Sequence, residues 1–169
     1  READSLFLDN STFGTPVALT EANARYSTEL FSVTALASFI SISDAKEINR
    51  AYANNTPESI VGMYGEASIN ILKLFNPSAK KTLDYFVRYE WMDLNQSIPS
   101  NGIINDANQK SFFVTGFDFS PAPGVIIKAD YVFRKTGELN EALIINPYPQ
   151  APPYYTENGF LNIGFGYSF

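Results

Sequence analysis

Apolar and polar residues alternate with a period of two along most of the chain. The alternation is clearest at the end, where every odd position from 161 to 169 is apolar and the positions between are small or polar. A period of two is that of a β-strand, whose successive side chains point to opposite faces. The pattern predicts an all-β, antiparallel protein of about seven strands, at residues 17–26, 31–39, 61–71, 82–94, 110–120, 124–135 and 160–169.

The connections between these strands alternate in length. Short ones are expected at 27–29, 76–80 and 121–124, and long ones near 1–16, 42–60, 95–109 and 136–158. A transmembrane β-barrel has short turns on one side of the membrane and long loops on the other, with strands of ~9–11 residues. The alternation therefore favours such a barrel, with the long connections as outer loops.

One helical segment is expected inside the first long loop after the second strand. Asp44 is a suitable N-cap, Glu47 follows three residues later, and Pro57 comes soon after the pattern ends. A capping residue with an acidic partner in the first turn is typical of a helix start. We expect two or three helical turns over residues 44–53.

An antiparallel β-sandwich would alternate in the same way and would use the apolar face as its core. Two features favour the membrane interpretation. The polar face carries charges and glycines in the middle of strands, and aromatic side chains, which make up 15% of the chain, concentrate toward strand ends, as in the interfacial girdles of barrels. The expected girdles are Phe31, Phe119, Tyr167 and Phe169 on the short-turn side, and Phe39, Trp91, Phe133 and Phe160 on the loop side.

The chain end, residues 164–169, reads Gly-Phe-Gly-Tyr-Ser-Phe. It resembles the C-terminal signal of outer-membrane β-barrels that their assembly machinery reads. Over roughly residues 24–169 the chain is also similar to the last strands of the phosphate-selective porin group, through the stretches 48–52, 85–90 and 127–131. The resemblance implies a location in the bacterial outer membrane and gives Phe165, Tyr167 and Phe169 the role of assembly signal. Deletion of Phe169 is expected to prevent assembly.

The strand count suggests an incomplete barrel. Bacterial single-chain barrels have an even number of strands, whereas about seven are expected here. An open sheet would also expose an unpaired edge to lipid, which is not tolerated. We therefore expect the sequence to be the C-terminal part of a larger barrel.

The chain lacks residue types that many enzymes use for catalysis. Cysteine and histidine are absent, so disulfides, thiolate chemistry, zinc-type sites and imidazole catalysis are excluded. No Gly-x-Ser-x-Gly elbow is present, and the net charge of −6 argues against binding to nucleic acid. No stretch reaches the ~18 apolar residues that a membrane helix needs. We expect no enzymatic activity, no cofactor and no metal.

The candidate functional residues are charges on the mixed face of the strands. A channel selects ions through such charges facing water, but charges on neighbouring strands also form ion pairs that stiffen the wall. Pairs of Arg88 with Asp118 or Glu66 with Arg88 are expected, and the pairing interpretation is favoured for most of the set. Arg88, Lys128 and Arg134 are expected to provide any anion preference. The pore-lining candidates are Glu21, Arg25, Glu66, Asp84, Arg88, Glu90, Asp118, Lys128, Asp130 and Arg134.

The sequence thus predicts a porin-like channel for passive diffusion of small hydrophilic solutes or ions. Two alternatives stay open: a structural or adhesive outer-membrane barrel without a conducting pore, and a soluble carbohydrate-binding β-sandwich. The expected partners of the channel are outer-membrane lipid, the barrel assembly machinery, small hydrophilic solutes or anions, and further copies of the chain, as in a trimer.

Overall fold

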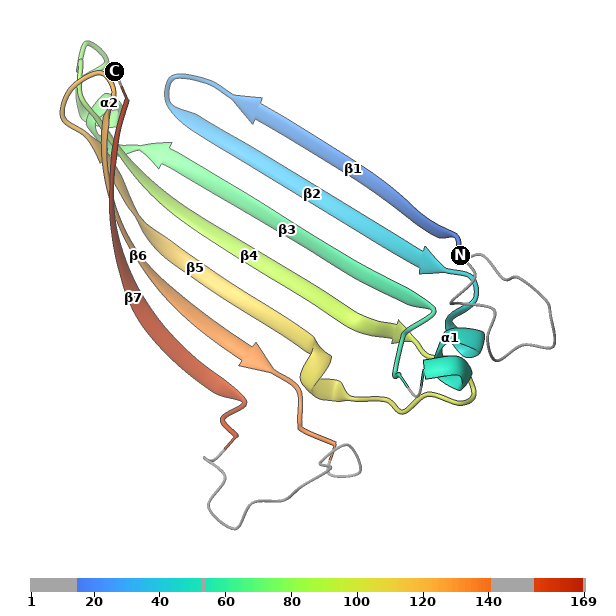
Figure 1. Ribbon diagram of the computed structural model, residues 1–169. Helices are drawn as coiled ribbons and strands as arrows, with labels where there is room; N and C mark the ends of the chain where they lie inside the picture. Colours follow the sequence, from blue (N-terminus) through green and yellow to red (C-terminus); the bar gives the residue numbers. More distant parts are fainter. Residues whose placement is uncertain (1–14, 53, 141–153, 169) are drawn as a thin grey trace.

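The computed structural model describes residues 15–52, 54–140 and 154–168. Seven strands form one open antiparallel sheet in which each strand pairs with its neighbours in sequence, as the alternation predicts (Figure 1). The strands are β1 (Val17–Ser27), β2 (Phe31–Ile42), β3 (Ser59–Asn70), β4 (Thr82–Ser97), β5 (Gln109–Ser120), β6 (Val125–Thr136) and β7 (Glu157–Tyr167). Most bounds lie within three residues of the predicted ones, and β4 extends three residues past its predicted end.

The strand register keeps the two sets of alternating residues on separate faces. Val87 on β4 lies opposite Ala67 on β3 and Thr115 on β5. Thr115 in turn lies opposite Tyr131 on β6. Applied to every pairing, the register defines an apolar face whose members include Tyr26, Val33, Ala35, Met63, Ala67, Tyr85, Val87, Tyr89, Phe113, Phe117, Ile127, Tyr131, Phe133, Leu161, Ile163 and Phe165. The alternate residues form the polar face.

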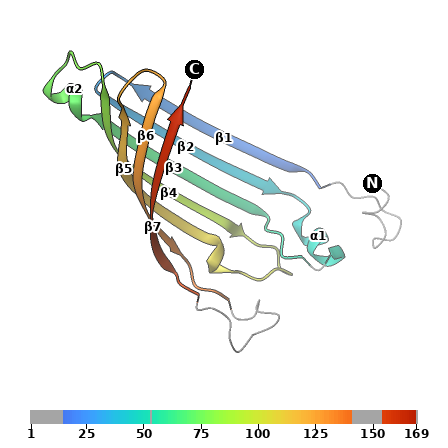
Figure 2. The same ribbon diagram turned by 60° about the vertical axis from the view of Figure 1, so that its left-hand side comes forward.

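Burial on the two faces is the reverse of that in a water-soluble sheet. Tyr89, Phe113 and Tyr131 are 53%, 46% and 48% exposed although they lie on inner strands. On the polar face, Phe86 is only 2% exposed. The sheet is strongly curved (Figure 2), and side chains on a concave surface converge and shield one another, so we assign the polar face to the concave side. The described residues contain no second sheet to cover the apolar face.

The connections between the strands lie at two opposite ends of the sheet. The turn end holds residues 28–30, 71–81 and 121–124, and the loop end holds residues 43–52, 54–58, 98–108, 137–140 and 154–156 (Figure 1). The turn at 121–124 closes as predicted, with Gly124 at a φ of 75°, a backbone conformation that glycine adopts without strain. The predicted helix of the first long loop is present as α1 (Ala45–Tyr52).

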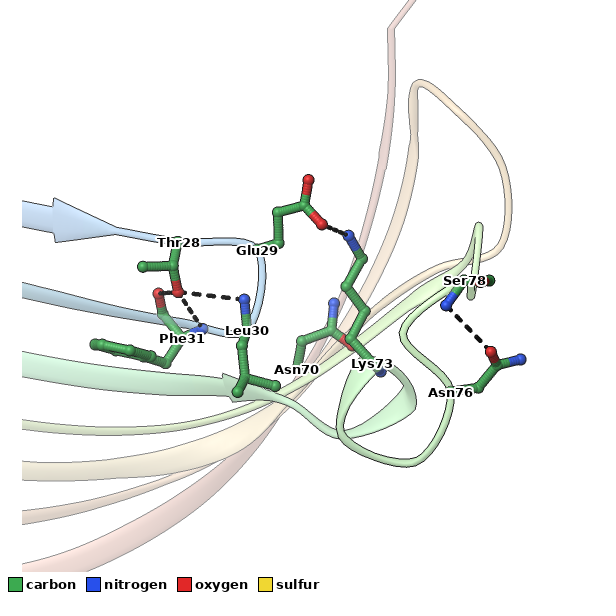
Figure 3. A network of polar contacts seen from close by, with 8 residues as sticks. All are labelled: Thr28, Glu29, Leu30, Phe31, Asn70, Lys73, Asn76 and Ser78. Carbon is green, nitrogen blue, oxygen red and sulfur yellow. Dashed lines mark hydrogen bonds and ion pairs between the residues drawn. The ribbon is translucent and has the colours of Figure 1, made fainter.

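The connection between β3 and β4 differs from the prediction. Instead of a short turn at 76–80, residues 71–81 form a longer connection that begins with the helix α2 (Ile71–Phe75). The side chain of Asn70 caps this helix by accepting the N–H of Lys73 at 3.1 Å (Figure 3). The apolar residues after Asn70 continue the strand pattern, which is why the helix was missed. Among the described residues, no helix is long and apolar enough to cross a membrane.

An ion pair fixes α2 against the β1–β2 turn. The Lys73 ammonium donates to the Glu29 carboxylate at 2.6 Å (Figure 3). This hydrogen bond, together with the attraction of the lysine charge, lowers the pKa of Glu29 below its ordinary value. A carboxyl group whose folded-state pKa is lowered stabilises the fold above its unfolded pKa, and the contribution is lost as the pH falls through the folded value. The contact between α2 and the turn is therefore expected to weaken in acid.

Asparagine side chains join the long connections at the loop end. Asn55 both donates to the carbonyl of Ile103 and accepts its N–H, each at 2.8 Å. Asn49 makes the same pair of contacts with the backbone of Thr56, at 3.0 and 2.6 Å. Asn140 donates to the carbonyl of Ile104 at 2.7 Å. Residues 43–58 (except 53), 98–108 and 137–140 thus form a connected loop layer.

Gly116 permits the close approach of β5 and β6. A Cβ atom there would collide with the carbonyl oxygen of Ala129 and lie 2.7 Å from the Asp130 Cα, whereas a Cβ at Gly65 would meet nothing within 4 Å. We expect Gly116→Ala to lower the free energy of unfolding by about 1–2 kcal/mol, as for other overpacked sites. Gly65→Ala should be neutral or raise it by up to ~1 kcal/mol, since glycine in a strand is unfavourable. Urea unfolding of both variants measures the difference, and equal effects would contradict this account.

Candidate functional site

All ten charged residues predicted as pore-lining candidates lie on the polar face. The register sets Glu66 opposite Arg88 and Asp118 opposite Lys128. The remaining members follow from the same alternation. By strand, the set is Glu21 and Arg25 on β1, Glu66 on β3, Asp84, Arg88 and Glu90 on β4, Asp118 on β5, and Lys128, Asp130 and Arg134 on β6.

Arg88 is held between two carboxylates. Its Nε donates to Glu66 at 2.8 Å and its Nη1 donates to Glu90 at 3.0 Å. The guanidinium also lies 5.8 Å from the centre of the Tyr64 ring. These three charged side chains are 27–31% exposed, so water screens them only in part. The predicted Glu66–Arg88 pair is confirmed, and the triad of Glu66, Arg88 and Glu90 carries a net charge of −1.

The alternative predicted pair of Arg88 with Asp118 is wrong. Arg88 lies opposite Val114, whereas Asp118 lies opposite Asp84 and Lys128. One carboxylate oxygen of Asp118 is buried without a hydrogen-bond partner among the described residues. The Lys128 ammonium instead lies 4.3 Å from the centre of the Phe86 ring, in the geometry of a cation–π contact. Register is set by turn geometry, which the charge pattern alone does not reveal.

An apolar cluster interrupts the charges on the polar face. Phe86, Val114 and Val132 are 2–8% exposed and pack together, with Phe112 against them. In the register, Phe112 lies between Glu90 and Arg134. This cluster was missed in the sequence analysis because its members fall on the face expected to carry both polar and apolar side chains. The sequence did contain a signal for it, since each member is an apolar residue at an even position between charged residues on β4, β5 and β6.

The triad borders a polar hollow of about 490 Å³ on the concave side. Its walls come from β1 to β4 and combine the guanidinium groups of Arg25 and Arg88 with two carboxylates and several hydroxyl groups. Arg25 makes no ion pair with any described residue, so it can turn toward a solute. The lining is Arg25, Ser32, Thr34, Tyr64, Glu66, Arg88 and Glu90. Such a surface can exchange hydrogen bonds with hydrophilic solutes without covalent chemistry.

The remaining charges of the face are less strongly paired. Asp130 is 8% exposed and accepts a hydrogen bond from Asn162 at 2.9 Å. Glu21 accepts one from Asn23 at 3.3 Å. Arg134 forms no ion pair with the described part of the chain. Arg25 and Arg134 are therefore cations of this face whose charge no adjacent carboxylate cancels.

Two predictions about aromatic residues have different outcomes. Phe165 and Tyr167 lie on the apolar face toward the turn end, opposite Ile127 and Val125, while Phe169 lies outside the described residues. Phe160 was placed in an apolar girdle, but it lies opposite Val132 and so belongs to the polar face.

The described residues include no group of three or more metal-ligating side chains that could hold a metal ion.

Comparison with known proteins gives one relative. An uncharacterized protein of Aquifex aeolicus (strain VF5) is 28% identical over 111 residues, which cover 60% of this chain. The match spans 25% of that relative's own length. No protein-family model matches the chain, and no solved structure is similar to it.

Proposed function

We propose that the chain is part of an outer-membrane β-barrel that conducts small hydrophilic solutes or ions by passive diffusion. The observation that carries the proposal is the reversed burial of the sheet. Aromatic and aliphatic side chains project from the convex face without a covering layer, while the charges converge on the concave face. In a barrel, lipid covers the first face and water fills the space inside the second.

The topology supports the same proposal. All neighbouring strands are antiparallel and joined in sequence order, and the two shortest connections, 28–30 and 121–124, share one end of the sheet with the helical connection 71–81, opposite the loop layer. Strands of 11–16 residues are long enough to cross a bilayer at a tilt. The turn end is then the periplasmic side, and the loop layer lies outside the cell.

Closure of the barrel requires strands beside β1 and β7. Both are edges of the sheet, and unpaired backbone groups are too costly in lipid. Because this chain matches only a quarter of its relative's length, we propose that the strands of a longer polypeptide complete the barrel. The porin group whose last strands the sequence resembles provides the model for this arrangement. Further copies of the chain are the alternative source of those strands.

Conductance through a planar lipid bilayer tests the proposal. Detergent-purified protein should insert and produce steady, ohmic single-channel steps, because the polar face would line a continuous aqueous path. Matched recordings after heat denaturation provide the control and should be silent. Absence of steps from protein that has inserted and resists protease would overturn the channel function.

The loop layer favours a second candidate function, that of an adhesive barrel. Its three connections are tied together by asparagine side chains and expose Ile103 and Ile104 at 43% and 64%. A fixed surface with exposed apolar groups is suited to binding a partner. Silent but correctly inserted protein would favour this function. The sandwich alternative gains no support, because it needs a second sheet packed on the apolar face.

A further inference from the structure

The connection at 71–81 exposes the most accessible aromatic side chain among the described residues. Phe75 is 83% exposed and its neighbour Leu74 is 53% exposed. In this position neither side chain contributes the roughly 1.5–3 kcal/mol of stability that the burial of such a side chain provides. An eleven-residue connection that ends its helix with two unburied apolar residues is also longer than a strand turn requires.

The orientation of α2 is fixed by polar contacts on one side. Asn70 caps the helix and its own N–H bonds to the carbonyl of Leu30 at 2.7 Å. Lys73 reaches back to Glu29 (Figure 3). These contacts use the side of α2 that faces the β1–β2 turn, and neither Leu74 nor Phe75 is buried by them.

Two lysines follow the apolar residues later in the same connection. Lys80 and Lys81 are exposed, and neither makes an ion pair with a described residue. The nearby acidic side chain of Glu29 is already bound to Lys73. Residues 74–81 therefore carry two exposed apolar side chains and two exposed cations without an ion pair to a described residue, the combination that binds the boundary between headgroups and acyl chains.

The position of α2 fits that boundary. It lies past the turn ends of β3 and β4 (Figure 2), and the rings of Tyr85 on β4 and Phe117 on β5 pack at 5.2 Å on the apolar face toward the same ends of their strands. We propose that α2 and residues 76–81 form an interfacial anchor in which Leu74 and Phe75 insert between phospholipids and Lys80 and Lys81 bind anionic headgroups. The inference rests on the proposed membrane location of the sheet and adds a lipid-binding site to it.

The test uses tryptophan fluorescence of the full chain in vesicles. Trp91 is the one natural tryptophan, so Trp91→Phe gives a dark background for Phe75→Trp. Vesicles are made of phosphatidylcholine alone or of equal parts phosphatidylcholine and phosphatidylglycerol, with bromine on the acyl chains near the headgroup. We expect blue-shifted emission and quenching, stronger in the anionic vesicles. The double variant Lys80→Gln, Lys81→Gln should remove the difference in quenching between the two kinds of vesicle. Each lysine is expected to strengthen binding of the segment to the anionic vesicles about fivefold.

Two control positions separate the outcomes. Phe117→Trp reports whether the apolar face meets lipid at all, and Ile104→Trp in the loop layer should stay in water. If Phe117→Trp is quenched while Phe75→Trp emits as in water, the anchor is overturned and the membrane location stands. If neither is quenched, both fail. If quenching of Phe75→Trp is equal in the two kinds of vesicle and unchanged by the two lysine substitutions, the headgroup-binding role of the lysines is overturned.

Discussion

Leu161→Arg is expected to destabilise the protein by ~2–4 kcal/mol in the proposed membrane location, the cost of an arginine near the middle of a strand that meets lipid. Leu161 is 67% exposed and lies opposite Tyr131, in the central row of the apolar face. In a sheet that meets water, the same change at so exposed a position would alter stability by no more than ~0.5 kcal/mol. The size of the effect therefore distinguishes the two environments.

Asn162→Arg is the matched control for this change. Asn162 is the next residue on β7 and its side chain donates to Asp130 on the polar face. An arginine there keeps a donor beside the same carboxylate, so folding should be nearly unaffected. Urea titration in vesicles and resistance to added protease measure both variants. Equal folding of the two would show that the apolar face does not meet lipid.

Arg88→Gln is expected to lower the free energy of unfolding by about 2–3 kcal/mol. The change removes two charge-assisted hydrogen bonds, each worth roughly 1.5–3 kcal/mol before screening by water, and leaves Glu66 and Glu90 without their shared cation. It also changes the charge of the triad from −1 to −2. The reversal potential in a salt gradient should therefore shift toward cation selectivity.

Arg134→Gln provides the comparison, because Arg134 has no ion pair within the described residues. It should shift the reversal potential in the same direction while changing stability by no more than ~0.5 kcal/mol. Glu66→Gln combined with Arg88→Gln should return the selectivity toward that of the unmodified protein. If Arg88→Gln and Arg134→Gln cost the same stability, the triad does not stiffen the wall.

The sequence predicted strands and faces well because alternation is a local property. In β7 every apolar residue from Leu161 to Tyr167 lies on the face expected of it. Antiparallel neighbours joined by short turns leave little freedom in sheet order, so the order of the seven strands also followed. The helix α1 was predicted from its cap and the acidic residue after it, both of which are local signals.

Features that depend on register or on local competition were not predicted. The pairing of Arg88 with Asp118 failed because a displacement of four residues along β5 separates Val114 from Asp118. The cluster around Phe86 arises only when three strands are aligned. For α2, the sequence held a usable signal in Asn70 as N-cap and the Asn76-Pro77 stop, but the apolar residues between them also fit a strand.

The asparagine contacts of the loop layer bear on how the opening would filter solutes. The backbone N–H groups of Thr56 and Ile103 lie in connections, yet both are bonded to asparagine oxygens. We expect these two amide protons to exchange more slowly with deuterated water than loop amides that lack a hydrogen bond. In the proposed channel, a rim held in this way would keep one diameter whether or not a solute is present. Discrimination at the mouth would then follow molecular size with a sharp cut-off, and permeation rates of a graded series of sugars would fall steeply at one radius.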